Sequence, residues 1–159
     1  MLKIHLNGKQ SIYLLFTAAI ILVDQITKHL ALLHLMIYEP KVIISGLFNL
    51  TLARNTGAAF SFLDSASGWQ THFFLYLNII ISLGLLIWLL VLPAKNRRKS
   101  FALGIIIGGA IGNIIDRIQL GYVVDFLDFY IKTHHWPIFN VADSAVCVGV
   151  ILLLWPDRE

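Results

Sequence analysis

Charged residues are scarce in this chain of 159 residues, at 13% of the composition, whereas hydrophobic residues make up 58%. Soluble domains contain roughly 25% charged and 45–50% apolar residues. The composition therefore excludes an ordinary soluble domain. It indicates a chain solvated by lipid, and the mean hydropathy of +0.78 points the same way.

The distribution of basic residues, the single cysteine and the absence of common catalytic motifs exclude several classes of function. The 12 lysines and arginines are dispersed without a basic groove or interleaved aromatic residues, so the net charge of +3 does not indicate a nucleic-acid partner. The single cysteine, Cys147, lies in an apolar run, which excludes a disulfide framework and a thiolate metal cluster. The sequence also lacks an H-E-x-x-H zinc motif, a G-x-S-x-G elbow and a glycine-rich phosphate loop. No metal or cofactor is predicted.

Four apolar runs are long enough to cross a bilayer core, which takes about 20 helical residues. The first is too long for a signal peptide, contains Asp24 and Lys28, and lacks a convincing cleavage site. The last is the weakest, because its first residues include Pro137 and Asn140. We expect a single integral membrane domain over residues 1–159, with spans at residues 11–35, 69–92, 100–118 and 136–155.

Basic residues predict the orientation of these spans. Lys3 and Lys9 precede the first span, and four basic residues between 95 and 99 connect the second to the third. The positive-inside rule places both termini and this connection in the cytoplasm. The outer connections are then residues 36–68, in which the segment 41–62 predicts two short strands around Ser45-Gly46, and residues 119–135, read as a loop.

Polar side chains in the spans converge on one depth. The first span runs outward and carries Asp24 about 20 Å along at ~1.5 Å per residue. The polar groups of the third span, and those at the start of the fourth, lie at their outer ends. Charge inside a membrane is costly and usually faces the protein interior or a watery cavity. The shared level predicts a site near the outer leaflet, formed by Asp24, Lys28, Asn113, Asp116, Arg117, Asn140 and Asp143, with Asp125 in the connection between the last two spans.

Each polar group alone also has a structural explanation. Asp24 and Lys28 fit an i,i+4 ion pair. Asn140 and Asp143 fit an N-cap and an acidic residue in the first helical turn. Arg117 fits a side chain that reaches for lipid phosphate. Glycines at every fourth position of the third span indicate close helix packing: Gly104, Gly108 and Gly112.

Carboxylates are the remaining candidates for chemistry. Two aspartates held close in a low-dielectric site share a proton. One then acts as a base on water while the other donates to the scissile carbonyl. Asp125 and Asp143 are the natural pair, and Asp128 is an alternative to Asp125 that spacing does not exclude. His134-His135 is read as part of a loop, because adjacent side chains on a strand point apart.

Five segments together resemble the motifs of the lipoprotein signal peptidases (signal peptidase II). They occur in family order over nearly the whole chain, and their combination is highly specific. The segments are VDQITK at 23–28, RNTGAAFS at 54–61, GNIIDR at 112–117, VVDF at 123–126 and FNVADS at 139–144.

The resemblance implies an aspartic endopeptidase of the bacterial cytoplasmic membrane, built from four transmembrane helices plus a small outer-face β-cradle. Its substrates would be diacylglyceryl-modified prolipoproteins, cleaved on the N-terminal side of the lipidated cysteine. It would work among membrane phospholipids without a cofactor, a metal or an obligate protein partner. Asp125 and Asp143 would form the catalytic dyad. The residues that line or support the site would be Asp24, Lys28, Asn55, Gly57, Asn113, Asp116, Arg117 and Asn140.

Three other classes fit less well. A small transporter or proton-relay subunit would show polar residues through the full membrane depth, whereas the inner halves here are almost wholly apolar. A presenilin-like intramembrane protease would carry a Gly-x-Gly-Asp signature, which is missing. A structural membrane module would not need so many aspartates near one level.

Overall fold

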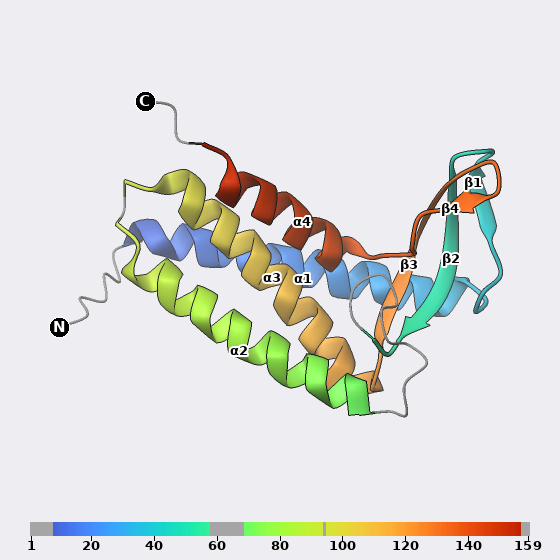
Figure 1. Ribbon diagram of the computed structural model, residues 1–159, viewed down its shortest axis with the longest axis horizontal. Helices are drawn as coiled ribbons and strands as arrows, with labels where there is room; N and C mark the ends of the chain where they lie inside the picture. Colours follow the sequence, from blue (N-terminus) through green and yellow to red (C-terminus); the bar gives the residue numbers. More distant parts are fainter. Residues whose placement is uncertain (1–7, 58–68, 94, 157–159) are drawn as a thin grey trace.

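The computed structural model describes residues 8–57, 69–93 and 95–156. Figure 1 shows long helices side by side with a small sheet at one end of the bundle. The predicted apolar runs are helical, and three helices are long and apolar enough to cross a membrane. The helices are α1 (Gly8–His34), α2 (Trp69–Val91), α3 (Arg97–Leu120) and α4 (Val141–Leu154).

The fourth helix is shorter than the predicted span at residues 136–155. It has 14 residues, or about 21 Å at ~1.5 Å per residue, against a bilayer core of about 30 Å. The reason lies in the residues before it. Asn140 is the N-cap and accepts a hydrogen bond from the Asp143 backbone. Phe139, one residue earlier, exchanges backbone hydrogen bonds with Leu127 of the sheet.

Helix α3 lies at the centre of the bundle and packs against α1, α2 and α4. Its glycines permit the close helix packing that the sequence predicted, and the partner is α1. A Cβ atom on Gly104 would lie 2.8 Å from the Tyr13 carbonyl oxygen, and one on Gly108 would lie 2.9 Å from that of Thr17. The Thr17 hydroxyl donates to the Gly104 carbonyl at 2.8 Å. The glycine ridge is therefore used for packing within the chain.

The connection between α1 and α2 contains two antiparallel strands, as predicted: β1 (Lys41–Ile44) and β2 (Phe48–Asn55). The turn between them contains Gly46 at φ +80°, a conformation that favours glycine. Residues 58–62 of the predicted segment lie outside the described residues.

The connection between α3 and α4 is not a loop, and that prediction was wrong. It contains β3 (Val123–Ile131) and β4 (His134–His135), which complete an antiparallel sheet in the order β1-β2-β3-β4. In the register of β2 and β3, Ala53 lies opposite Asp125 and Asn49 opposite Asp128. Both aspartates are therefore placed by a strand.

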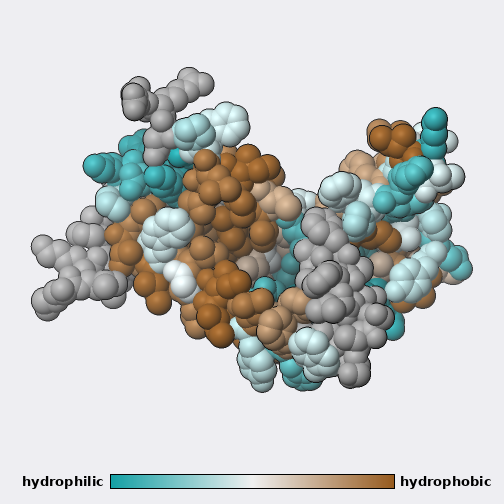
Figure 2. Space-filling view, viewed as in Figure 1, coloured by the Kyte–Doolittle hydropathy of each residue, from teal (hydrophilic) through white to brown (hydrophobic). Residues whose placement is uncertain are grey.

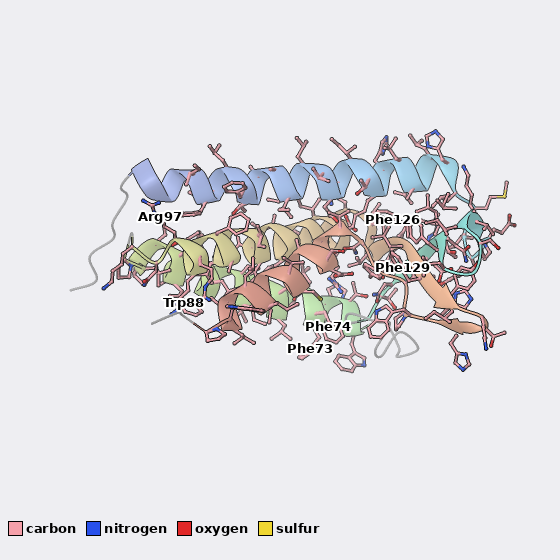
Figure 3. The ribbon with its side chains drawn as sticks, turned by 90° about the horizontal axis from the view of Figure 1, so that it is seen from above. Phe73, Phe74, Trp88, Arg97, Phe126 and Phe129 are labelled. Carbon is pink, nitrogen blue, oxygen red and sulfur yellow. The ribbon has the colours of Figure 1, made fainter. Side chains whose placement is uncertain are left out.

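An apolar cluster joins this sheet to the end of α1. Ala31 of α1 packs with Leu52, Val124 and Phe126 of the sheet, and all four are buried. Figure 3 shows Phe126 and Phe129 at the sheet end of the molecule, far from Arg97 at the start of α3. The cluster fixes β3, and with it Asp125, against the ends of the helices.

Candidate functional site

A buried lysine joins α1 to α3. The Lys28 ammonium lies 2.9 Å from Asp24 Oδ2 and 2.9 Å from Asp116 Oδ2. It also donates to Asn113 Oδ1 at 2.9 Å. The pair Asp24–Lys28 is thus more than a self-contained i,i+4 ion pair, since its cation is shared with α3. Buried charges persist only when paired and hydrogen-bonded in this way.

The same two carboxylates also accept hydrogen bonds from neighbouring backbone N–H groups. Asp24 Oδ1 accepts from the Ala142 N–H at 2.8 Å, at the start of α4. Asp116 Oδ2 accepts from the Val124 N–H at 3.0 Å, in β3. Gln25, which the sequence analysis did not single out, donates to Asp116 Oδ1 at 2.9 Å. The network therefore sets where α4 begins and where β3 passes.

Asp125 is enclosed by amides. Asn140 Nδ2 donates to its Oδ1 at 2.7 Å, and Asn55 Nδ2 donates to its Oδ2 at 2.9 Å. The side chain is 1% exposed. Burial, together with the negative charge of Asp143, raises the pKa of Asp125 to about 7. Asp125 can therefore hold or release a proton near neutral pH.

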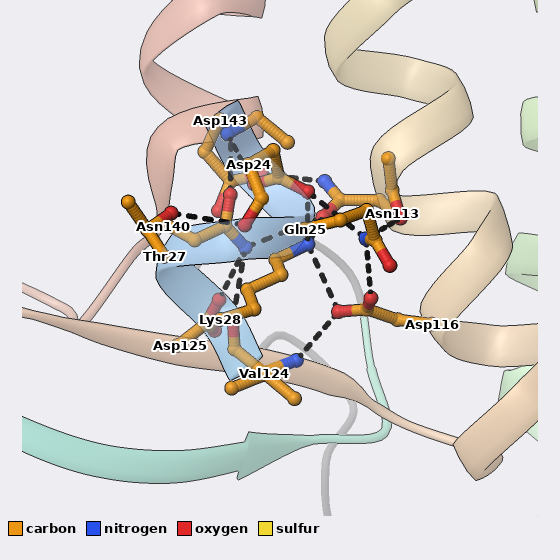
Figure 4. Close-up of polar contacts among 12 residues, drawn as sticks. Asp24, Gln25, Thr27, Lys28, Asn113, Asp116, Val124, Asp125, Asn140 and Asp143 are labelled. Atoms are coloured by element: carbon orange, nitrogen blue, oxygen red, sulfur yellow. Dashed lines mark hydrogen bonds and ion pairs between the residues drawn. The ribbon is translucent and has the colours of Figure 1, made fainter. Parts of the chain in front are cut away.

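Asp143 occupies the first turn of α4. Its backbone N–H donates to Asn140 Oδ1 at 2.8 Å, so the predicted helix cap is real. Its carboxylate Oδ1 accepts from Asn113 Nδ2 at 2.8 Å. Asn140 Nδ2 also approaches Asn113 Oδ1 at 3.2 Å. The cap is thus part of a network that connects Asp143 to Asp125, and Figure 4 shows this convergence.

The end of β2 and the residues that follow it are held by α3. Arg117 donates from Nη2 to the Gly57 carbonyl at 2.7 Å. The Gly57 N–H in turn donates to Asn55 Oδ1 at 3.0 Å. These two bonds fix the orientation of the Asn55 amide, so that its nitrogen faces Asp125.

A cavity of about 280 Å³ opens between α2, α3 and α4 beside these groups. Its polar wall includes Asn55, Asn113, Arg117 and Asp143, and the rest is mainly apolar. Figure 2 shows the surface hollowed between the apolar helices and the sheet, with hydrophilic residues in the hollow. An elongated chain with apolar side chains fits such a lining.

Asp128, the alternative to Asp125, belongs to a separate cluster on the sheet. It accepts from Asn49, Thr51 and His135 at 3.1, 2.8 and 2.7 Å. Although burial favours its neutral form, these bonds hold the pKa of Asp128 below its ordinary value. His134-His135 forms β4 instead of the predicted loop. Among the described residues, no group of three or more His, Cys, Asp or Glu side chains is placed to hold a metal ion.

The geometry agrees with comparisons of the whole chain. The model of a family described as signal peptidase (SPase) II matches residues 16–156. The chain belongs to the signal peptidase II family. The resemblance carried by the five motifs is therefore confirmed.

Curated lipoprotein signal peptidases are similar over most of their length. One from Ralstonia nicotianae is 50% identical over 134 residues, which are 84% of this chain and 76% of that protein. One from Coxiella burnetii is 48% identical over 142 residues, covering 89% and 86%. A solved structure described as a bacterial membrane enzyme matches with a TM-score of 0.80 at 35% identity, covering 97% of this chain and 90% of its own. The fold is therefore that of a multi-pass membrane enzyme, and the chain is a peptidase.

The structure brings the predicted site residues of this signal peptidase II member into one region. The hydrogen bonds and ion pairs above connect Asp24, Lys28, Asn113, Asp116, Asn140, Asp125 and Asp143, with Asn55, Gly57 and Arg117 attached through Asp125 and α3. Neither Asp125 nor Asp128 lines the cavity itself. Asp125 shares Asn140 with the Asp143 network, whereas Asp128 is held by three donors in a separate cluster on the sheet. The residue that sequence reasoning missed, Gln25, is adjacent to Asp24 within the first motif, so its position in that motif was the available signal.

Proposed function

We propose that this chain is an aspartic endopeptidase of the bacterial cytoplasmic membrane that cleaves the signal peptide from diacylglyceryl-modified prolipoproteins. Asp125 and Asp143 form the catalytic dyad, and the cut falls on the N-terminal side of the lipidated cysteine. The observation that carries the assignment is Asn140. Its side chain bonds the Asp125 carboxylate and the Asp143 backbone at once, and thereby fixes two acids that lie 18 positions apart.

The dyad performs the hydrolysis with one shared proton. The ionised carboxylate takes a proton from a water molecule as that water attacks the scissile carbonyl carbon. The protonated carboxyl donates to the carbonyl oxygen, and the carbon becomes tetrahedral. The intermediate collapses when the acid that took the water proton donates it to the peptide nitrogen and the C–N bond breaks. The other carboxylate takes a proton from a hydroxyl of the tetrahedral carbon, so the pair again holds one proton. The pKa of about 7 at Asp125 favours this chemistry, because Asp125 can then both hold and release a proton at neutral pH. No metal or cofactor is required.

Amides orient the two acids. Asn113 holds one oxygen of Asp143, and Asn55 and Asn140 hold both oxygens of Asp125. Neutral donors position a carboxylate without adding a full positive charge, which would favour permanent ionisation. Lys28 supplies positive charge one step further away, through Asn113. Asp24 and Asp116 keep Lys28 in place.

The depth of the dyad in the membrane determines how the substrate reaches it. The basic connection around residues 95–99 belongs in the cytoplasm, so the sheet and the dyad lie near the outer face of the membrane. A lipid-modified cysteine presents its peptide bond at that level while its acyl chains remain among the phospholipids. Extended substrate is then clamped between the helices and the sheet, in part through main-chain bonds.

Four variants test the dyad against a structural role. Asn at position 125 or 143 preserves size but removes the titratable oxygen, so turnover of a lipid-modified precursor should fall by ~10²–10⁴-fold or more. Since the two acids act as a unit, the double variant should be scarcely worse than either single one. The matched control is Asp128→Asn, which should retain substantial activity. All variants are compared at equal levels of membrane insertion.

Substantial turnover by Asp143→Asn would show that this acid serves only the helix cap. An Asp128→Asn variant as inactive as Asp125→Asn would show that the choice between the two sheet aspartates is wrong.

A further inference from the structure

Asn78 is an isolated carboxamide in a strongly apolar helix. Between Phe73 and Val91, the other side chains of α2 with a hydroxyl or amide group are those of Tyr76 and Ser82. Placing an amide in hydrocarbon is costly unless its hydrogen-bonding groups find partners. The position therefore calls for an explanation beyond helix formation.

The Asn78 side chain belongs to the wall of the cavity beside the dyad. It lines that cavity together with Ile81 and Leu85, three and seven positions further along the same face of α2. The opposite walls carry Asn113 of α3 and Asp143 of α4. Asn78 is half-buried, and its side-chain amide forms no hydrogen bond with any residue in the described ranges 8–57, 69–93 and 95–156. An amide donor and an amide acceptor are thus available to whatever occupies the cavity.

Depth places Asn78 on the membrane side of the dyad. It is nine residues from Trp69, about 13 Å along α2 from the end nearest the sheet. Figure 3 shows Phe74, another residue of the cavity wall, near that same end. A substrate whose scissile bond lies at Asp143 passes Asn78 with the part of the signal peptide that remains in the bilayer.

That part of the substrate needs hydrogen-bonding partners. A peptide must be extended where it is cleaved, so residues just before the scissile bond lack helical hydrogen bonds. In the bilayer, peptide N–H and C=O groups have no water to replace those bonds. A carboxamide carries one acceptor oxygen and two donor hydrogens, which suits it to pair with a peptide group.

We propose that Asn78 is a substrate-binding residue that pairs with a main-chain peptide group of the signal peptide just before the scissile bond. The contact sets the depth of the substrate relative to Asp143. It selects an extended backbone and is indifferent to side-chain identity. This inference rests on the proposed peptidase function.

The first test is Asn78→Leu, which keeps the size of the side chain and suits an apolar helix. The kcat/KM for a lipid-modified precursor should fall about 10-fold, as expected for one lost hydrogen bond. The loss should be carried by KM, because the contact is present before and during reaction, and the pH profile should not change. Ser82→Ala is the control: Ser82 lies one turn further on and lines a different cavity, so both kinetic constants should be unchanged.

The second test changes the substrate. Precursors carry a backbone ester in place of one amide at each of the four positions before the scissile bond, which removes one N–H at a time. At the contacted position the ester should slow the wild type about 10-fold and have little further effect on Asn78→Leu. Such non-additivity identifies a direct contact. It is not produced by a general loosening of the fold.

Two kinetic results would overturn the proposal: an unchanged KM in Asn78→Leu, or additive effects at all four ester positions. A loss of self-association in Asn78→Leu with unchanged kinetics would also overturn it, because Asn78 would then be a contact between two copies of α2. If the wild type cleaves no lipid-modified precursor, the proposed function fails as well. If the wild type and Asn78→Leu both cleave the precursor normally, the proposed role of Asn78 is wrong but the proposed peptidase function stands.

Discussion

Replacing Asp125 with asparagine should abolish cleavage. It should also remove the stability loss that the wild-type protein suffers when Asp125 ionises at higher pH. Burial, then the charge of Asp143, raises the pKa of Asp125 from 3.8 to about 7. The folded protein therefore keeps a proton that the unfolded chain releases near pH 3.8. The contribution of Asp125 to stability is fully present below that pH and is lost as the pH rises to about 7.

The size of the effect follows from the shift. About 3 pKa units correspond to ~4 kcal/mol at alkaline pH, of which ~2–3 kcal/mol is lost between pH 5 and pH 8. Solvent screens little of this, because Asp125 is 1% exposed. The new amide nitrogen would face the Asn55 or Asn140 donor, at a cost of ~1–3 kcal/mol. That cost is the same at every pH and cancels when two pH values are compared.

The assay is thermal unfolding of both proteins in detergent at pH 5 and pH 8. The difference in Tm, variant minus wild type, should be larger at pH 8 than at pH 5 by roughly 5–10 °C. At this chain length ~1 kcal/mol shifts Tm by ~2–4 °C. Asp128→Asn should show no such increase, because the pKa of Asp128 lies below its ordinary value. A difference that stays constant with pH in Asp125→Asn would refute the argument that burial keeps Asp125 protonated.

Other features of the molecule give three further predictions. Reporter fusions near Lys95 should report the cytoplasm and fusions near Thr133 the outer side; a cytoplasmic signal at Thr133 would overturn the orientation. Cleavage should survive EDTA and o-phenanthroline, and activity that is lost and then restored by zinc would require the aspartates to be a metal site. Gly109→Ala should destabilise the protein by ~1–3 kcal/mol, because its new Cβ would press on the Ala142 carbonyl oxygen. Gly84→Ala, which meets nothing within 4 Å, should unfold at or slightly above the wild-type temperature.

Helices were predictable from the sequence because the bilayer demands long apolar runs. The strand β3 was not, because Asp125 and Asp128 interrupt its apolar pattern and aspartate is depleted in strands. Its pairing with β2 joins residues about 70 positions or more apart, such as Asn49 with Asp128. The start of α4 was missed for a similar reason, since Phe139 bonds to β3 before the helix begins.

The candidate site was visible because charges and amides are anomalous in apolar spans. Counting residues along each helix placed Asp24 and Asp143 at one level without any structure. The choice between Asp125 and Asp128 needed the sheet register, which turns one toward Asn55 and Asn140 and the other toward Asn49 and Thr51. Uncharged amides such as Gln25 carry a weaker signal than charges, so their contacts emerged only from the packing.

Whether this chain removes signal peptides from lipid-modified prolipoproteins is decided by the cleavage of two precursors that differ only in the diacylglyceryl group on the cysteine. The purified protein is incubated with each, and the products are identified by mass. We expect a single cut on the N-terminal side of the lipidated cysteine, an intact unmodified precursor, and no cut of either by Asp143→Asn. Equal cleavage of both precursors, or an intact lipid-modified precursor, would contradict it.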